Sequence, residues 1–546
     1  MEPEELTEWE QRFVDACLKY AELYKGDKRV KNMIYKSAYL LYNKFQFDNA
    51  ATQFRAVIAM NPASQQAEYA AQLILDALVV KEDWDSLRTT AKAFYDEKKL
   101  GGKVFKTDAY NIYENASFKL IDVTFEKDKD YSKAADAYMG FYEEFRETAK
   151  LEKTAKAVNN AAVYYSKSGR VADAVTAREI LVEDEKYAGK TKYYYEQVGF
   201  LGYDYERIAD YDKAAGYYEK LWGLYQERTG KKEKLSDDLV QQAGDAIFSA
   251  AVFRKGLGEW QQSITDYNAF VKAYPTDSRV ADIKLRVGKI YEEQEQWEDA
   301  ANAFQEFYAK PPKGSPMHFT YFARLHHGQA LSKLGQTSAR DKVYADTIKL
   351  YNKYVESGGE KGPQTEYVAE MLYTAALPSL ATYEAMRIEG KRGVSKKRED
   401  AALKKSLEAK TKTYLEVEKS FQEVVNLGAG RWGIAALVAL GKTYDNMAKS
   451  LRTSDVPSYL TDEQVEFYSM TIEDRAYLQE EKAVSAFKLA IDKSFELTLY
   501  NDDSAFATRR LGELRPEDYP GLHEQLVKPR WTSSKSGKKY DIEKSL

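Results

Sequence analysis

The sequence is poor in the residues that build disulfide frameworks, metal centres and tight turns. Its 546 residues include one cysteine, Cys17, together with 4 histidines, 12 prolines and 30 glycines. A single cysteine excludes an intramolecular disulfide and any cysteine-based zinc or iron–sulfur site. The scarcity of proline and glycine argues against all-β architecture, which needs many turns, and against collagen-like or low-complexity chains.

The sequence also lacks a long hydrophobic run and a strong net charge. Its longest strongly apolar stretch, residues 434–440, is far too short to span a bilayer, so we expect no direct membrane insertion. The start, Met1-Glu-Pro-Glu-Glu, is acidic and is not typical of a secretory signal. Lys and Arg number 81 against 86 Asp and Glu, and the formal charge of -5 is unfavourable for neutralising phosphates. A helical-repeat nucleic-acid binder is therefore the least favoured alternative.

What the sequence does contain is helical periodicity. Alanine, leucine, charged residues and an unusual 43 tyrosines recur at three- and four-residue spacing almost throughout, and β-type runs are missing. This pattern predicts an all-α fold. A second, longer pattern places an apolar residue, a small residue, an alanine, an aromatic and a proline at fixed offsets, as in Ile34, Ala38, Ala50, Phe54 and Pro62.

The same slots recur along the chain. Later copies pair Ala134 with Tyr138, Ala214 with Tyr218, and Ala300 with Phe304. Small residues let two helices approach closely, and aromatic side chains fill the grooves between them. Because each helix pair leaves an apolar face uncovered, the next pair must stack against it. The copies are spaced more widely than the roughly 34 residues of an ideal array, so we expect an irregular solenoid.

The pattern changes along the chain and suggests four parts. We predict an N-terminal helix over residues 1–29, a solenoid over 30–355, a C-terminal helical region over 356–515 and a flexible tail over 516–546. Within the third part, a helix with Gly441 and Tyr444 and a helix with Ala483 and Phe487 look like one repeat. About 30 residues separate its halves, and Thr461 with Gln464 predicts a capping box at a helix start inside the insert.

These slots resemble the tetratricopeptide repeat family over residues 30–350 and again over 430–495. The stretch 274–307 is similar to repeats of bacterial cell-envelope proteins, such as outer-membrane assembly lipoproteins of the BamD type and Tol–Pal-associated proteins. The stretch 431–483 is similar to repeat proteins of δ-proteobacterial motility and envelope machines. The resemblance implies a right-handed superhelical α-solenoid that acts as a non-enzymatic protein–protein scaffold, in the periplasm or cell envelope. The cytoplasm is the alternative compartment.

No residue pattern supports an enzyme, a cofactor or a metal. The triplets at 189–191 and 441–443 read Gly-Lys-Thr, but neither has the glycine five residues earlier that a phosphate-binding loop requires. His326 and His327 are adjacent, so on a helix they point about 100° apart and cannot chelate one ion. We therefore expect no small-molecule substrate.

The family geometry implies a partner-binding surface on the inner wall of the fourth to seventh repeats. The residues expected there are Asn159, Val163, Tyr203, Glu206, Phe248, Val252 and Lys289. Tyrosine suits such a surface because it combines apolar area with a hydrogen-bonding tip. The expected partners are other proteins, within an envelope complex. A structural, self-assembling oligomer is the alternative from another class.

Residues 387–412 are a basic stretch with ten basic and four acidic residues. It has the charge to bind nucleic acid, anionic lipid or an acidic protein, although a solvated helix is the commoner explanation of such a run. It contains no aromatic residue on which a base could stack.

Overall fold

The computed structural model describes residues 2–520, with no side-chain description for residues 126–128. This part of the chain forms 22 α-helices and contains no β-strand. The predicted all-α, solenoid-type fold is therefore confirmed. Most of the tail predicted for residues 516–546 lies outside the described residues.

Two compact units make up the chain, Met1–Ala273 and Tyr274–Leu546. The boundary between them falls inside the range 30–355 that we predicted as one solenoid. The predicted four-part division stays a prediction.

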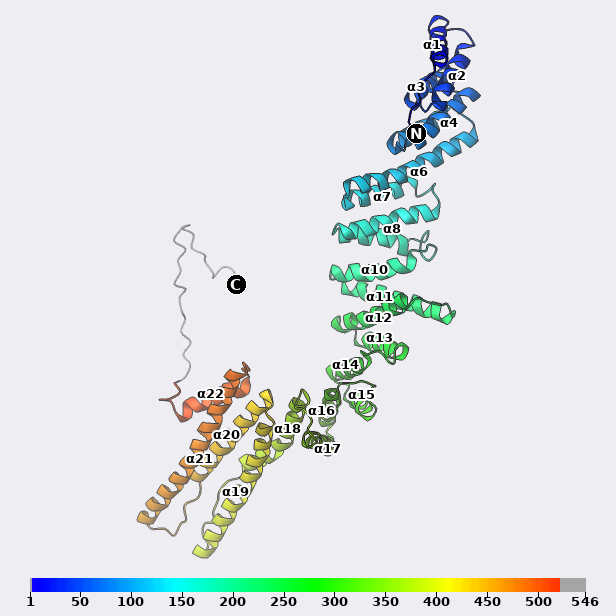
Figure 1. Ribbon diagram of the computed structural model, residues 1–546. Coiled ribbons are helices and arrows are strands. Elements are labelled where there is room, and N and C mark those ends of the chain that lie inside the picture. Colours follow the sequence, from blue (N-terminus) through cyan, green and yellow to red (C-terminus); the bar gives the residue numbers. More distant parts are fainter. Residues whose placement is uncertain (1, 521–546) are drawn as a thin grey trace, which may run out of the picture. The chain divides into compact units, whose positions relative to one another are not determined.

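The first unit is a succession of helices in which each packs on its neighbours in the sequence (Figure 1). Its helices are α1 (Glu8–Leu23), α2 (Val30–Asn43), α3 (Phe47–Met60), α4 (Gln65–Val80), α5 (Trp84–Asp96), α6 (Lys103–Asp128), α7 (Tyr131–Phe145), α8 (Leu151–Lys167), α9 (Val171–Glu183), α10 (Tyr194–Arg207), α11 (Tyr211–Gly230), α12 (Asp237–Gly256) and α13 (Trp260–Ala273). A continuous apolar core runs from Val14 to Tyr187, and a second begins at Val175.

The second unit continues with helix pairs and ends in three long helices. Its helices are α14 (Val280–Glu293), α15 (Trp297–Ala309), α16 (Met317–Lys333), α17 (Thr337–Glu356), α18 (Gln364–Ala385), α19 (Lys396–Leu427), α20 (Gly430–Arg452), α21 (Asp462–Glu496) and α22 (Asp502–Leu514). Helices α19 and α21 both pack against α20 (Figure 1). The capping box predicted at Thr461 is present, with Gln464 completing it at the start of α21.

A left-handed residue recurs in the turn between the two helices of each repeat. It lies five residues before the position that Ala50 occupies in the first repeat. The residues with positive φ angles are Phe45, Glu82, Lys129, Gly169, Ala209, Gly258, Glu295 and Gly335. This backbone conformation is easiest for glycine and costs other residues roughly 1–2 kcal/mol. Its regular recurrence marks eight copies of one turn, although only three of the eight residues are glycine.

Small residues in the first helix of a repeat lie directly against the aromatic slot of the second. A methyl group placed on Gly202 of α10 would lie 2.6 Å from a ring carbon of Tyr218 on α11. The corresponding distance is 2.6 Å for Gly288 and Phe304, and 2.4 Å for Gly441 of α20 and Phe487 of α21. These contacts are too close for any side chain larger than a hydrogen atom, so the two helices approach as the small slots require.

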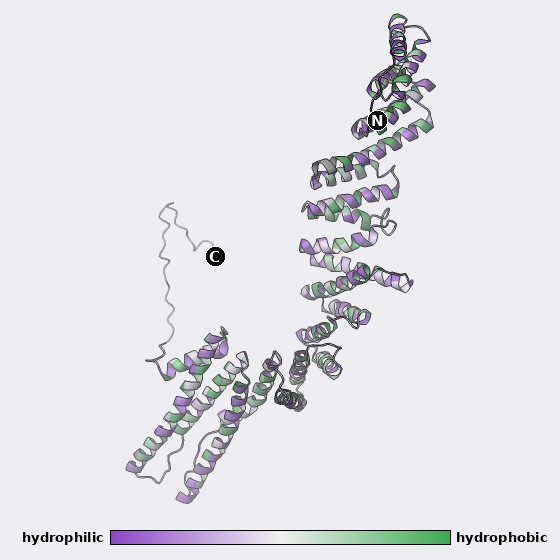
Figure 2. Ribbon diagram, viewed as in Figure 1, coloured by the Kyte–Doolittle hydropathy of each residue, from purple (hydrophilic) through white to green (hydrophobic). Residues whose placement is uncertain are grey.

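The helices are amphipathic. Figure 2 shows hydrophobic and hydrophilic residues interleaved along the helices of both units. Between residues 2 and 520, no helix combines the length and the apolar character needed to cross a membrane.

Candidate protein-interaction surface

Six of the seven predicted partner-binding residues lie on three helices of the first unit. Asn159 and Val163 are on α8, Tyr203 and Glu206 on α10, and Phe248 and Val252 on α12. These three are the first helices of successive repeats. Tyr203 is 52% exposed, whereas the other five are partly buried.

The seventh residue, Lys289, lies on α14 in the second unit. Its ammonium group donates to Glu292 Oε2 at 2.7 Å, and His326 Nδ1 lies 3.0 Å from the other carboxylate oxygen of Glu292. Burial alone would raise the pKa of Glu292, but the His326 and Lys289 contacts outweigh it and leave the pKa below its usual value. Lys289 therefore holds a buried carboxylate in its ionised form.

Asn159 is held by a hydrogen bond that fixes which way its amide points. Gln197 Nε2 of α10 donates to Asn159 Oδ1 at 2.9 Å. The Nδ2 group lies on the opposite side of the amide from this contact, and it donates no hydrogen bond within the described part of the chain. Asn159 therefore presents a donor of fixed orientation, which suits a carbonyl acceptor.

A buried arginine behind this surface was missed by sequence reasoning. Arg178 of α9 is 3% exposed, and its Nε donates to Asp204 Oδ2 of α10 at 2.8 Å. Its guanidinium also donates to Gln197 Oε1 and, at 2.9 Å, to Ser166 Oγ of α8. Arg178 thus orients the glutamine that in turn orients Asn159.

The repeat pattern itself contained the signal for Arg178. This residue follows Ala174 by four positions, and most other repeats hold an aromatic residue in the same slot. Those aromatics are Phe54, Tyr138, Tyr218, Tyr267, Phe304, Tyr344 and Phe487. A cation in a buried slot that usually holds a ring needs a buried counter-charge, and Asp204, 1% exposed, supplies it.

Burial lowers the pKa of Arg178, and the carboxylate of Asp204 opposes that shift. Arginine stays charged under all ordinary conditions. An ion pair this deeply buried gains stability only when its remaining hydrogen-bonding groups are satisfied, and the contacts to Gln197 and Ser166 satisfy them.

Helix α10 presents two exposed rings above this network. Phe200 is 38% exposed and lies over the Arg178 guanidinium, whose central carbon is 4.5 Å from the ring centroid. Tyr203 follows three residues later on the same face, with Arg207 5.8 Å from its ring centroid. Aromatic rings held at a surface by cations are typical of protein-binding sites.

The other predicted residues contribute less free surface. Glu206 accepts a hydrogen bond of 2.8 Å from the Tyr218 hydroxyl. The ring of Phe248 packs edge-on against Tyr267 and Phe270, with centroids 6.0 and 6.1 Å away. These two side chains therefore serve repeat packing as well as the surface.

The sequence elements considered for phosphate or metal chemistry occupy structural positions. Gly189 lies in the turn after α9, and Gly441 lies inside α20. His326 faces Glu292, whereas His327 Nδ1 lies 2.9 Å from the hydroxyl of Tyr308. Within the described residues, no group of three or more His, Cys, Asp or Glu side chains could hold a metal ion.

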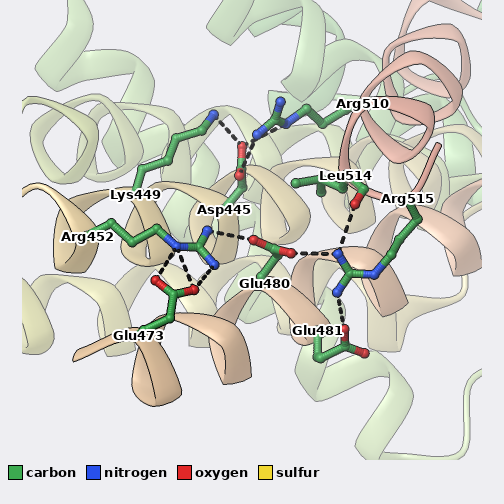
Figure 3. Close-up of polar contacts among 9 residues, drawn as sticks. All are labelled: Asp445, Lys449, Arg452, Glu473, Glu480, Glu481, Arg510, Leu514 and Arg515. Carbon is green, nitrogen blue, oxygen red and sulfur yellow. Dashed lines mark hydrogen bonds and ion pairs between the residues drawn. The ribbon is translucent and has the colours of Figure 1, made fainter. Parts of the chain in front are cut away.

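A cluster of acidic side chains on α20 and α21 is matched by arginines (Figure 3). Arg452 of α20 bonds Glu473 and Glu480 of α21 at 2.7 and 2.6 Å. Arg515, at the end of α22, bonds Glu480 at 2.6 Å and also Glu481. Burial alone would raise the pKa of Glu480, but the bonds from Arg515 and Arg452 hold it below its usual value.

The same ladder continues through Asp445 of α20. Arg510 of α22 bonds Asp445 through two nitrogens at 2.8 and 3.0 Å, and Lys449 adds a contact of 2.8 Å (Figure 3). The cluster joins α20, α21 and α22, and its carboxylates are committed to these cations. We assign it a structural role.

Residues 245–277, which form most of α12, all of α13 and the turn that follows, match the tetratricopeptide repeat family. The matched segment is one of the helix pairs described above. It contains two of the predicted surface residues, Phe248 and Val252. Proteins built from tetratricopeptide repeats generally bind other proteins through the surfaces that stacked repeats create.

Several solved structures are similar to the chain at low identity. BtubC from P. vanneervenii is 14% identical, with 43% of this chain and 92% of that chain covered and a TM-score of 0.24. A tetratricopeptide repeat protein from Parabacteroides merdae is 12% identical, with 63% and 98% covered and a TM-score of 0.18. The apo form of RapI is 12% identical, with 77% and 98% covered and a TM-score of 0.27. No curated protein matches the sequence.

Proposed function

We propose that this protein is a non-enzymatic scaffold that binds partner proteins on the surface formed by α8, α10 and α12. The observation that carries the proposal is the arrangement around Arg178. This buried cation orients the Asn159 amide through Gln197 and lies beneath the exposed ring of Phe200. A fixed amide donor beside exposed aromatic rings suits an extended polypeptide, whose carbonyl groups accept and whose side chains cover the rings.

We further propose that the partners belong to a bacterial envelope complex and that the protein acts in the periplasm or at the cell envelope. The support is the resemblance of residues 274–307 and 431–483 to envelope repeat proteins. Fractionation of the native cells tests this placement. Recovery of the protein with the periplasmic or envelope fraction supports it, and recovery with the cytoplasm alone contradicts it.

The binding surface is tested by a pair of matched double variants. Asn159→Ala with Tyr203→Ala removes the oriented amide and the most exposed ring. Asn32→Ala with Tyr39→Ala makes the same changes on α2, where Gln66 donates to Asn32 Oδ1 at 3.3 Å and Tyr39 is likewise exposed. Native partners are captured on wild-type protein and identified by mass spectrometry, and their binding to each variant is then measured with purified components.

We expect the variant on α8 and α10 to lose about tenfold or more in affinity, since truncating a central anchor typically costs 2 kcal/mol or more. The variant on α2 should bind as the wild type does. Equal binding by all three proteins would place the partner surface elsewhere.

A further inference from the structure

The second unit contains an apolar groove between the first halves of α19 and α21. Its volume is about 440 Å³. The end of α20 and the connection from α20 to α21 form its floor. Its apolar lining consists mainly of Leu403, Leu407, Leu451, Pro457, Leu460 and Ile472. A second hollow of about 490 Å³ shares Leu460, Tyr468 and Thr471 with it and extends along α21 to Phe467.

The groove is held open by contacts at its two ends. Towards the middle of the helices, Tyr414 of α19 donates to Gln479 of α21 at 3.1 Å and accepts from Lys482 at 3.2 Å. At the other end, Glu399 at the start of α19 accepts from the backbone nitrogen and the hydroxyl of Ser458 at 2.7 and 2.8 Å. The Tyr414 contacts therefore join the two walls, and the Glu399 contacts join α19 to the connection that forms the floor, with the apolar lining between them.

The outward face of α21 beside the groove is apolar as well. Phe467, Met470 and Leu478 are 74%, 63% and 62% exposed. Their spacing of three and eight residues places them on one face of the helix. Large exposed apolar side chains gathered on one face mark an interaction surface.

The groove lining carries two cations and one carboxylate, whereas carboxylates border the apolar face. Lys404 and Arg475 line the groove; Lys404 lies 3.9 Å from Glu408, and among the described residues Arg475 forms no ion pair. Lys396 lies over the ring of Tyr459 at 4.4 Å, and the one carboxylate in the lining, Asp400, accepts a hydrogen bond from that tyrosine.

The apolar face of α21 is bordered by carboxylates. Asp462, Glu463, Glu466 and Asp474 form no ion pair in the described part of the chain, and α21 is therefore an acidic amphipathic helix over its first half. Such a helix matches a groove with an apolar floor and cationic walls.

We propose that two copies of this chain associate through helices α19 to α21, each inserting the Phe467–Leu478 face of α21 into the groove between α19 and α21 of the other. Both complementary surfaces are present on one chain, so a single two-fold arrangement buries both grooves and both faces. At 1.5 Å per residue, the lining residues from Asp400 to Leu407 span roughly 10 Å, about the length of two helical turns. Two turns of α21 from one copy are long enough to place Phe467, Met470 and their acidic neighbours against the groove of the other copy.

This inference is independent of the proposed partner-binding function, because it uses the second unit alone. The Asn159→Ala, Tyr203→Ala variant should self-associate as the wild type does. If the chain does not self-associate, the proposal for partner binding on α8, α10 and α12 still stands. If partner binding fails its test, the proposal for self-association still stands.

The test uses full-length protein and two charge-reversal variants. Lys404→Glu with Arg475→Glu reverses the groove walls, and Glu466→Lys with Asp474→Lys reverses the border of the apolar face. Arg398→Glu with Lys405→Glu makes the same charge change as the first variant on exposed residues of α19 that do not line the groove. Mass is measured by light scattering and by analytical ultracentrifugation over a range of concentrations.

We expect the wild type to have twice its 62.4 kDa mass at micromolar concentration. Each reversal of the groove walls or of the acidic border should weaken the dimer about tenfold or more, since like charges then face each other. A mixture of the two should restore association, because both contacts of the mixed dimer are complementary again. The Arg398, Lys405 variant should remain dimeric.

A wild type that stays monomeric at high concentration overturns the proposal, as does a mixture that fails to associate. Dissociation of the Arg398, Lys405 variant to the same extent would also overturn it, because net charge would then be the cause. A monomeric chain that sediments with vesicles of anionic lipid, and loses this on reversal of Lys404 and Arg475, would show that the groove serves a membrane surface instead.

Discussion

At the scale of single residues, the departure from the repeat pattern at Arg178 carries most of the functional argument. An aromatic ring in that slot would only fill space, whereas the guanidinium orients Gln197 and pairs with Asp204. Arg178 stands where most other repeats have a ring, and its hydrogen bond to Gln197, which in turn donates to Asn159, links it to the surface above it.

Replacing Arg178 by alanine should destabilise the first unit by about 3–5 kcal/mol, because it removes the buried hydrogen-bonding partner of the Asp204 carboxylate and leaves it only the more distant Arg207. Arg207 provides the matched control. Its side chain is 38% exposed and lies 3.7 Å from the same carboxylate, so Arg207→Ala should cost less than about 1 kcal/mol. Urea unfolding followed by circular dichroism measures both. Similar urea midpoints for the two variants would contradict the assignment of Arg178 as the main partner of Asp204.

Asp266 of α13 is a second buried charge at the residue scale. It is 3% exposed, and burial together with the neighbouring Glu219 raises its pKa to about 7, against the opposing effects of Gln262 and Arg254. The unfolded value is 3.8. Between these pH values the folded state holds one more proton than the unfolded state, so the free energy of unfolding falls as the pH rises through this window.

Asp266→Asn stays neutral at every pH and should remove this dependence. We expect the variant to melt at a higher temperature than the wild type at pH 8, the difference to shrink as the pH falls towards 5, and the two to converge only below the unfolded pKa of 3.8. Asp212→Asn, at an exposed carboxylate that also contacts Arg254, is the control and should keep the wild-type pH profile. A constant difference between Asp266→Asn and wild type from pH 5 to pH 8 would rule out titration of Asp266 as the cause.

At the scale of elements, helix pairs are brought together by small residues that meet rings. The pair α20 and α21 shows this most clearly, because Gly441 and Phe487 are far apart in the sequence and yet occupy the same two slots as Gly202 and Tyr218. These two helices can approach so closely because Gly441 has only a hydrogen atom in place of a side chain.

Gly441→Ala should therefore destabilise the second unit by about 1–3 kcal/mol, although alanine is the better helix former. Gly433→Ala lies in the same helix and its new methyl group would meet nothing within 4 Å. That variant should gain up to about 1 kcal/mol from helix propensity alone. Denaturant midpoints of the two variants should move in opposite directions, and movement in the same direction would refute the packing argument.

At the scale of the whole molecule, a chain of stacked repeats transmits a local change to its neighbours and little further. Each helix of the described chain packs mainly on those next to it in the sequence, so stability is nearly a sum of local terms. The chain is also divided after Ala273 into its two compact units.

We expect Gly441→Ala to increase amide hydrogen exchange in α18 to α22 and to leave exchange in α2 to α4 unchanged. Hydrogen–deuterium exchange read by mass spectrometry over short labelling times measures this peptide by peptide. Gly433→Ala serves as the control and should protect α20. A uniform rise in exchange along the whole chain would show instead that the protein unfolds as one cooperative body.

The sequence by itself determined the fold class, the positions of the repeats and the capping box at Thr461. These features follow from local periodicity and from short-range hydrogen bonds, which residues close in the chain specify. It also placed six surface residues on the first helices of successive repeats, because helix periodicity assigns residues to a face.

Only the tertiary structure decided what those residues meet. The pairing of Arg178 with Asp204, the orientation of Asn159 by Gln197, and the groove between α19 and α21 all join residues from different helices. Such contacts depend on which side chains neighbouring helices bring together at a given height and rotation, and periodicity along one helix contains no information about that.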